Sequence, residues 1–64
     1  MSYEMACTFL TETSAAVKIF DHVTDEIYWI PLSQVDAMHG KGSDGRGEGS
    51  IVMSDWIAQK KGFI

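Results

Sequence analysis

The chain has little of what small proteins commonly use to reinforce a fold. Its 64 residues include one cysteine, Cys7, and one proline, Pro31. A lone cysteine excludes an internal disulfide, and without a cysteine cluster a structural zinc site is disfavoured. A chain of this length buries only about 60% of the surface of its unfolded form, and its core rarely supplies more than ~3–5 kcal/mol. We therefore expect one domain, residues 1–64, held by close packing or by self-association as a homodimer.

Long apolar runs are missing as well. A transmembrane helix needs about 20 consecutive apolar residues, and no stretch of this sequence approaches that length. The first four residues, Met-Ser-Tyr-Glu, have neither the basic nor the apolar region of a signal peptide. The sequence therefore predicts a cytoplasmic protein that makes no membrane contact.

Basic residues are scarce, because 5 Lys and Arg stand against 9 Asp and Glu, for a net charge of −4. Residues 1–40 hold six acids and one base, which gives −5, whereas residues 41–64 hold three acids and four bases, which gives +1. Sequence-independent binding of nucleic acid depends on Lys and Arg that neutralise phosphates, so this balance disfavours direct nucleic-acid binding. It favours a basic surface on a partner protein.

The residues that are present predict mostly strands. From Tyr3 to Thr11 the odd positions 3, 5, 7 and 9 are apolar or aromatic while the even ones include polar residues at 4 and 8, which is the two-residue period of a half-buried strand. Ala15–Phe20 and Ile27–Ile30 are rich in β-branched and aromatic residues, which favours two more strands. The polar segment Asp21–Glu26 between them has the length of a hairpin loop. Pro31 has no backbone N–H, so the third strand should end there or lie at an edge.

A connection, a loop and a fourth strand follow. Leu32–Met38 is predicted as a connection that includes one helical turn. Residues 40–49 hold five of the six glycines and no apolar side chain, so nothing there offsets the cost of ordering. We expect a flexible loop in this segment, with a hairpin tip at Asp44-Gly45. Ile51–Met53 should form a brief strand.

The clearest local signal is a short helix over residues 55–61. Ser54 is a preferred N-cap residue, and Gly62 stands where a left-handed residue ends many helices. A helix this short needs tertiary packing to persist. We expect Trp56 and Ile57 to provide it by packing on the sheet.

These elements predict a β-rich α+β fold. It would be a small antiparallel curled sheet, or a partly open barrel of SH3-like or OB-like kind, with about four strands and a short C-terminal helix. In the third strand, Ile27 and Trp29 should face one way and Tyr28 and Ile30 the other. In so small a chain, we expect about two of the three large aromatic residues Tyr28, Trp29 and Trp56 to lie in the core.

Two stretches, Ile27–Val35 and Val52–Gly62, carry a resemblance. They resemble a group of short phage and prokaryotic proteins in which a strand ending in Trp-Ile-Pro-Lys-Ser-Gln precedes a variable loop and a closing Trp-containing helix. The match covers about a third of the chain, and Leu32 replaces the usual lysine. Most members of this group are uncharacterised, but small acidic phage proteins are often inhibitors of host defence or host enzymes, anti-CRISPR proteins among them. The resemblance implies that class of function.

Residues suited to catalysis or to cofactor binding are few. Residues 40–45 fit the G-x-G-x-x-G pattern, but a dinucleotide site also needs a βαβ unit, which this sequence does not predict. Cys7, His22 and His39 match no metal-binding spacing, and Cys7 falls on the apolar side of the first strand. We therefore expect a non-enzymatic protein that binds no cofactor and no metal.

The favoured function is binding to, and inhibition of, a host protein or protein–nucleic-acid complex through an acidic surface. Ordinary solvated acids remain the simpler interpretation of the same residues. The predicted contact residues lie in the hairpin and in the glycine-rich loop: Asp21, Asp25, Glu26, Tyr28, Lys41 and Arg46.

The alternative function is a single-stranded nucleic-acid-binding module. In that case Tyr28 or Trp29 would stack on bases, since aromatic platforms bind single strands with little sequence preference. Lys18, Lys41 and Arg46 would contact the phosphates. A homodimeric structural role is a third hypothesis.

Overall fold

The computed structural model describes residues 2–64. Within that range the chain forms five strands, one 3₁₀ turn and one helix. In the described range no helix has both the length and the apolar character needed to cross a membrane. The elements follow one another as β1 (Ser2–Glu12), β2 (Ala16–Asp21), β3 (Glu26–Pro31), η1 (Leu32–Gln34), β4 (Val35–His39), β5 (Gly47–Ser54) and α1 (Asp55–Lys60).

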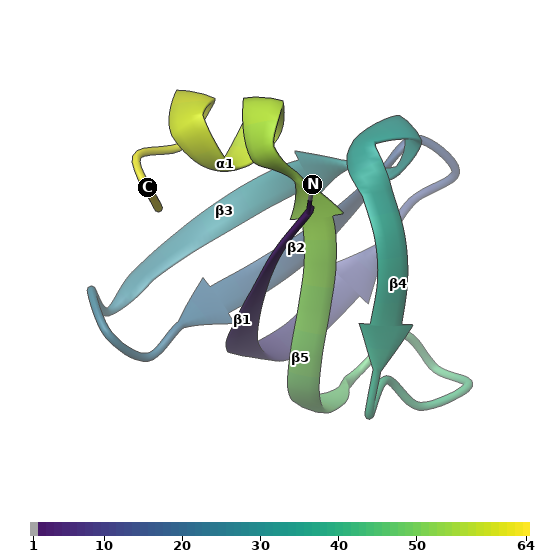
Figure 1. Cartoon of the computed structure of the whole chain (residues 1–64). Helices are drawn as coiled ribbons and strands as arrows, with labels where there is room; N and C mark the ends of the chain where they lie inside the picture. The colour runs from purple at the N-terminus through teal and green to yellow at the C-terminus, as the bar shows by residue number, and fades with distance from the viewer. Residues whose placement is uncertain (1) are drawn as a thin grey trace.

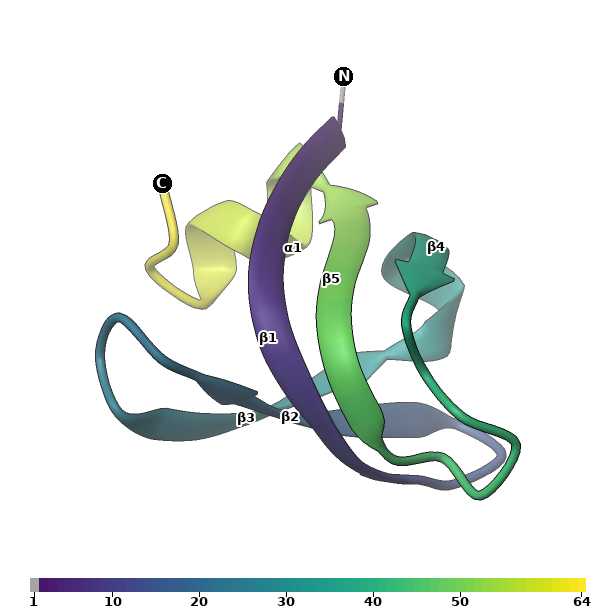
Figure 2. The same cartoon turned by 90° about the horizontal axis from the view of Figure 1, so that it is seen from below.

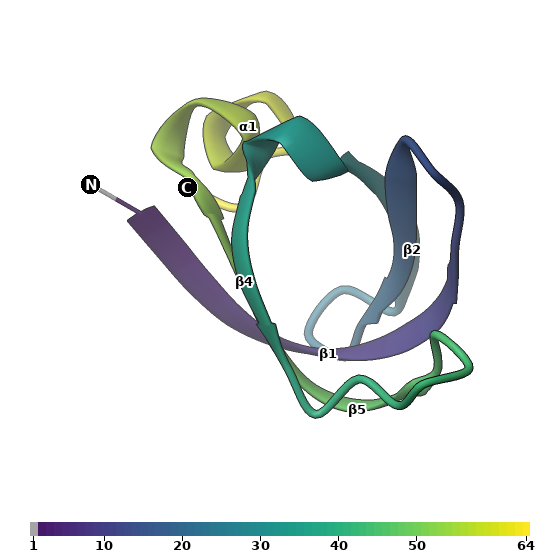
Figure 3. The same ribbon diagram turned by 90° about the vertical axis from the view of Figure 1, so that its right-hand side faces the viewer.

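The strands form one antiparallel sheet in the order β3-β2-β1-β5-β4 (Figure 1). The sheet curls strongly, and β4 and β2 face each other across the ring of ribbon in Figure 3. β3 and β4 are its two edges, so the sheet stays open. The predicted β-rich α+β fold with a curled antiparallel sheet and a short C-terminal helix is thus confirmed.

β1 is the central strand, and its alternation behaves as predicted. It pairs with β5 along most of its length and with β2 through its second half, where a bulge lies between Phe9 and Thr11. Cys7 and Phe9 are each 1% exposed, whereas Glu4 and Ala6 face solvent. The inward side chains of β1 therefore belong to the hydrophobic core.

The core draws on four strands and the helix. Its buried members come from the inward faces of β1, β2, β3 and β5 and from one side of α1: Cys7, Phe9, Val17, Ile19, Ile30, Ile51, Met53, Ile57 and Ala58. The predicted packing of Ile57 is confirmed, but the prediction for Trp56 is wrong, because its side chain is 56% exposed. Adjacent helical residues point about 100° apart, so a helix of one and a half turns that buries Ile57 and Ala58 turns Trp56 outward.

The sheet has five strands where the sequence predicts about four, and the larger differences lie at β4 and at the start of β5. Val35–His39, predicted as part of a connection, is the edge strand β4, which pairs with β5 through a bulge between Val35 and Ala37. The helical turn predicted in this connection is η1. β5 begins at Gly47 and not at Ile51, so the last part of the predicted loop 40–49 is strand. β4 forms by pairing with β5, and the first residues of β5 form by pairing with β1, despite weak local propensity.

The shortened loop between β4 and β5 closes through a tight turn. The Gly45 backbone N–H donates to the Gly42 carbonyl at 3.0 Å, and Gly45 is left-handed with φ of 82°. This is a turn followed by a left-handed glycine, a common hairpin solution. It encloses Ser43 and Asp44, one residue earlier than the predicted tip.

Both ends of α1 follow the sequence prediction. Ser54 Oγ accepts a hydrogen bond from the Ile57 backbone N–H at 3.3 Å. Gly62 is left-handed with φ of 82°, and its N–H donates to Gln59 while that of Phe63 donates to Ala58. These two bonds form a Schellman motif, which reverses the chain after the helix. The reversal returns Phe63 to the sheet.

Candidate functional site

The turn between β2 and β3 is organised by a buried carboxylate. Asp21 is 4% exposed, and its oxygens accept hydrogen bonds from the Val23 N–H at 2.9 Å and from Thr24 Oγ1 at 3.1 Å. Asp25 takes the left-handed conformation, with φ of 57°, which Asp tolerates better than most residues. Asp21 therefore lies inside the hairpin, and its predicted place on an exposed acidic surface is wrong.

Two acidic residues of the hairpin do face solvent. Asp25 and Glu26 are both exposed, and Glu26 accepts a hydrogen bond from the Tyr28 hydroxyl at 2.8 Å. Tyr28 itself is half-buried and packs edge-to-face against Phe63 at a centroid distance of 4.8 Å. The acidic surface predicted for this segment thus consists of Asp25 and Glu26.

Apolar side chains stand beside the acidic pair. Val23 is 91% exposed, Ile27 54% and Trp29 43%. Ile27 and Trp29 lie on the outer face of β3, as the alternation predicted, while Ile30 is fully buried. The Lys18 ammonium of β2 lies 5.7 Å from the Trp29 ring centroid. The prediction that about two of the three large aromatics are core is wrong, since both tryptophans are exposed and Tyr28 is half-buried.

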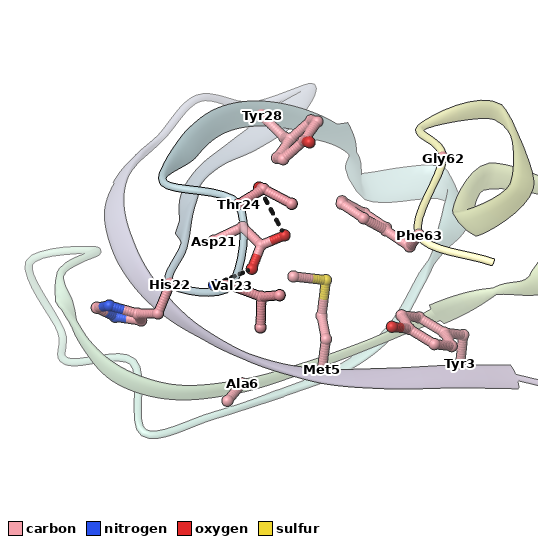
Figure 4. A pocket seen from close by; sticks show the side chains of 10 residues that line it. All are labelled: Tyr3, Met5, Ala6, Asp21, His22, Val23, Thr24, Tyr28, Gly62 and Phe63. Carbon is pink, nitrogen blue, oxygen red and sulfur yellow. Dashed lines mark hydrogen bonds between the residues drawn. The ribbon is translucent and has the colours of Figure 1, made fainter.

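A pocket of about 210 Å³ lies under the hairpin (Figure 4). Its walls come from three parts of the chain: the first half of β1, the β2–β3 hairpin and the segment after α1. Figure 4 shows the Asp21 carboxylate between Met5 and Tyr28, with Phe63 opposite and the His22 ring pointing away. The residues that line it are Tyr3, Met5, Ala6, Asp21, His22, Val23, Thr24, Tyr28, Gly62 and Phe63.

Sequence reasoning did not find this pocket. The sequence does carry a signal for Phe63. The residue after a left-handed glycine at a helix end often makes an apolar contact back to the helix, and Phe63 follows Gly62. Nothing local indicated that Tyr3 and Met5 would face Asp21 across the sheet. Their meeting depends on the curl of β1 and on the β1–β2 register.

The two basic residues of the predicted site lie elsewhere. Lys41 forms an ion pair with Glu12, next to the β1–β2 turn, and Arg46 is exposed in the β4–β5 loop. Figures 1 and 2 place that loop and the β2–β3 turn on opposite sides of the molecule. The structure therefore separates Lys41 and Arg46 from the hairpin residues with which they were predicted to act.

Cys7 and the histidines are dispersed. The Cys7 thiol is buried, whereas His39 is exposed at the end of β4. His22 Nε2 lies 2.6 Å from Thr8 Oγ1, and its ring packs edge-on against Phe20. Among residues 2–64, no three His, Cys, Asp or Glu side chains are placed to hold a metal ion.

The Cys7 thiol should make the fold less stable as the pH rises in the alkaline range. Burial, with a smaller contribution from the Asp21 charge, raises the pKa of Cys7 from 9.0 to about 11. The folded chain then keeps a proton that the unfolded chain releases, so the free energy of unfolding falls as pH rises through this interval. Urea denaturation below pH 9.0 and near pH 11 should show this loss. Cys7→Ala should lose less over the same interval, and an equal loss in both chains would contradict the assignment.

Comparison of the chain with protein-family models, curated proteins and solved structures gave no match. The geometry brings three features together at the β2–β3 hairpin. These are an exposed acidic pair, an exposed apolar strand face and a pocket with a buried carboxylate. We call this region the hairpin site.

Proposed function

We propose that this chain is a non-enzymatic protein that binds a partner protein through the hairpin site. The observation that carries the proposal is the exposure of Ile27 and Trp29 beside Asp25 and Glu26. Tryptophan is enriched among the residues that dominate binding energy, and polar residues surround such anchors in protein interfaces. An apolar strand face with an acidic rim has this composition.

The charge of the site indicates a basic partner surface. Asp25 and Glu26 are exposed, and the whole chain carries a net charge of −4. Complementary charge steers association and selects among partners. The resemblance to short phage and prokaryotic proteins supports the narrower proposal that the partner is a host machine that handles nucleic acid, inhibited in the host cytoplasm.

A second candidate, binding of single-stranded nucleic acid, is favoured by one observation. The Lys18 ammonium lies 5.7 Å from the exposed Trp29 ring, and a cation beside an aromatic platform suits a base and its phosphate. Two other observations weigh against it. Lys41 is paired with Glu12, and the Tyr28 ring is packed against Phe63.

Replacing Trp29 with threonine should weaken partner binding. Threonine keeps the strand propensity of the position but removes the aromatic anchor, and such an anchor contributes ~2 kcal/mol or more, about thirtyfold in affinity. The partner is captured from lysate of the cells that contain this chain and then purified. Its dissociation constant is measured by calorimetry for both proteins, with thermal denaturation as the folding check.

The molecule offers a matched control in Trp56→Thr. Trp56 is 56% exposed and also has a lysine, Lys60, 5.0 Å from its ring centroid, but it lies on α1 and outside the hairpin site. We expect this variant to bind as the parent chain does. Equal affinities for both variants would refute the proposal, and salt-sensitive quenching of Trp29 fluorescence by single-stranded oligonucleotides would favour the second candidate.

A further inference from the structure

The pocket under the hairpin encloses a negative charge within aromatic walls. The Asp21 carboxylate lies inside it, 4% exposed (Figure 4). Phe63 joins the aromatic residues into one wall, with its ring centroid 4.8 Å from that of Tyr28 and 6.1 Å from that of Tyr3. None of the ten residues that line the pocket is Lys or Arg.

The carboxylate keeps unused capacity to accept hydrogen bonds. Its partners here are the Val23 N–H and the Thr24 hydroxyl, both of them neutral donors. A carboxylate offers about four lone-pair sites, so two donors leave capacity for a ligand. Burial of a charge is costly unless an opposite charge or further hydrogen bonds compensate for it. A cation in the pocket would supply both.

The aromatic residues of the lining also favour a cation. The faces of aromatic rings attract cations, most strongly where water is excluded. Met5 and the Val23 methyl groups offer apolar contacts for the stem that long basic side chains bury. The volume of about 210 Å³ is below the ~300–1,000 Å³ typical of pockets for drug-sized ligands. The space therefore suits a single side chain better than a cofactor.

We propose that this pocket binds the basic end of an arginine or lysine side chain carried by a partner protein. The inference rests on the proposed function in one respect, that the partner is a protein. Glu26 does not line the pocket, but it adds a second negative charge nearby, since it accepts a hydrogen bond from the hydroxyl of the lining residue Tyr28. Asp21 thus has two roles: it orders the turn through Val23 and Thr24, and it presents a carboxylate to the ligand.

Short peptides test the pocket without knowledge of the partner. The ¹⁵N-labelled chain is titrated with acetyl-Gly-Arg-Gly-amide and with acetyl-Gly-Lys-Gly-amide. The neutral counterparts contain citrulline and norleucine. We expect saturable, salt-sensitive shifts of the Thr24 and Phe63 amide signals with the basic peptides alone, at dissociation constants on the order of 1 mM.

Two variants and one control assign the effect to the pocket. Asp21→Asn keeps an acceptor for the Val23 N–H but removes the charge, and Phe63→Leu keeps apolar volume but removes the ring. Each should weaken binding of the basic peptides about tenfold, with thermal denaturation confirming that both fold. Asp36→Asn removes the same charge from an exposed position of β4, and its affinity should match that of the parent chain.

The remaining outcomes separate this inference from the proposed function. Equal shifts with the citrulline or norleucine peptides would overturn it, as would a loss in Asp36→Asn as large as that in Asp21→Asn. Binding of tetramethylammonium chloride without binding of either basic peptide would overturn the assignment to a side chain. These results leave the Trp29→Thr comparison unaffected, because that comparison measures the outer face of β3.

Discussion

Replacing Gly49 with alanine should abolish the folded state. Gly49 pairs with Cys7 of β1, and a Cβ added to it would overlap the backbone carbonyl of His39, where β4 ends against β5. No rotamer change relieves a clash with backbone, so the edge strand would have to move away. We expect a loss at or above the top of the ~1–3 kcal/mol that overpacking usually costs, in a domain whose core rarely supplies more than ~3–5 kcal/mol.

Gly42→Ala is the matched control for this substitution. Gly42 lies in the same hairpin, and its added Cβ would approach the Arg46 carbonyl oxygen at 3.0 Å, a tight contact but far less severe than the overlap at Gly49. Far-ultraviolet circular dichroism and urea denaturation should show a cooperative transition for Gly42→Ala and none for Gly49→Ala. A Gly49→Ala chain as stable as the control would show that β4 does not approach β5 as closely as described.

Phe9→Ala should destabilise the fold to a similar extent. Phe9 is 1% exposed, among the largest fully buried side chains of the core, and it lies where β1 pairs with both β2 and β5. Truncation of a buried phenylalanine costs ~3–5 kcal/mol through lost burial and the cavity left behind. That loss equals the whole stability expected of a core this small. The chain should therefore be largely unfolded at room temperature.

Phe20→Ala provides the comparison for Phe9. Phe20 lies one strand away on β2, half-buried, with its ring edge against His22 at 5.0 Å. The same atoms are removed, but from the outer face of the sheet. Urea denaturation followed by tryptophan fluorescence should place the midpoint of Phe20→Ala well above that of Phe9→Ala. Equal midpoints would contradict the assignment of the core to the inner face.

Stability and binding should be separable in this molecule. The side chains that hold the fold, such as Phe9 and Ile19, are fully buried on the inner face. The residues proposed for binding, Ile27 and Trp29, lie on the outer face of an edge strand. Because few buried contacts depend on them, a Trp29 variant can lose its partner and keep its fold. Asp21 is the exception, since it serves both the turn and the pocket.

The structure predicted for the hairpin is correct where it depends on neighbouring residues. The polar segment between β2 and β3 does form a hairpin turn, and Asp25 and Glu26 are exposed on it. Asp21 was misplaced because composition does not show which carboxylate of a turn folds back onto its own backbone. The sequence groups Lys41 and Arg46 with the hairpin because they lie in the glycine-rich loop expected to be flexible. Loop composition carries no information about the distance between two loops.

What the sequence by itself determined are features that arise within a few residues. The alternation of β1 placed Cys7 and Phe9 inside, because successive strand side chains point to opposite faces. Ser54 and Gly62 set the ends of α1, because capping satisfies backbone groups within one turn. The β-rich α+β class follows from these local patterns together.

Only the tertiary structure decided which apolar faces are covered. β4 is a strand because it pairs with β5. Trp29 and Trp56 are exposed because they lie on the outer sides of β3 and α1, away from the core. The pocket exists because the curl of β1 and the chain reversal at Gly62 bring Tyr3, Tyr28 and Phe63 together. Such contacts join residues far apart in sequence, and their free energy depends on strand register and sheet curvature, which no local pattern specifies.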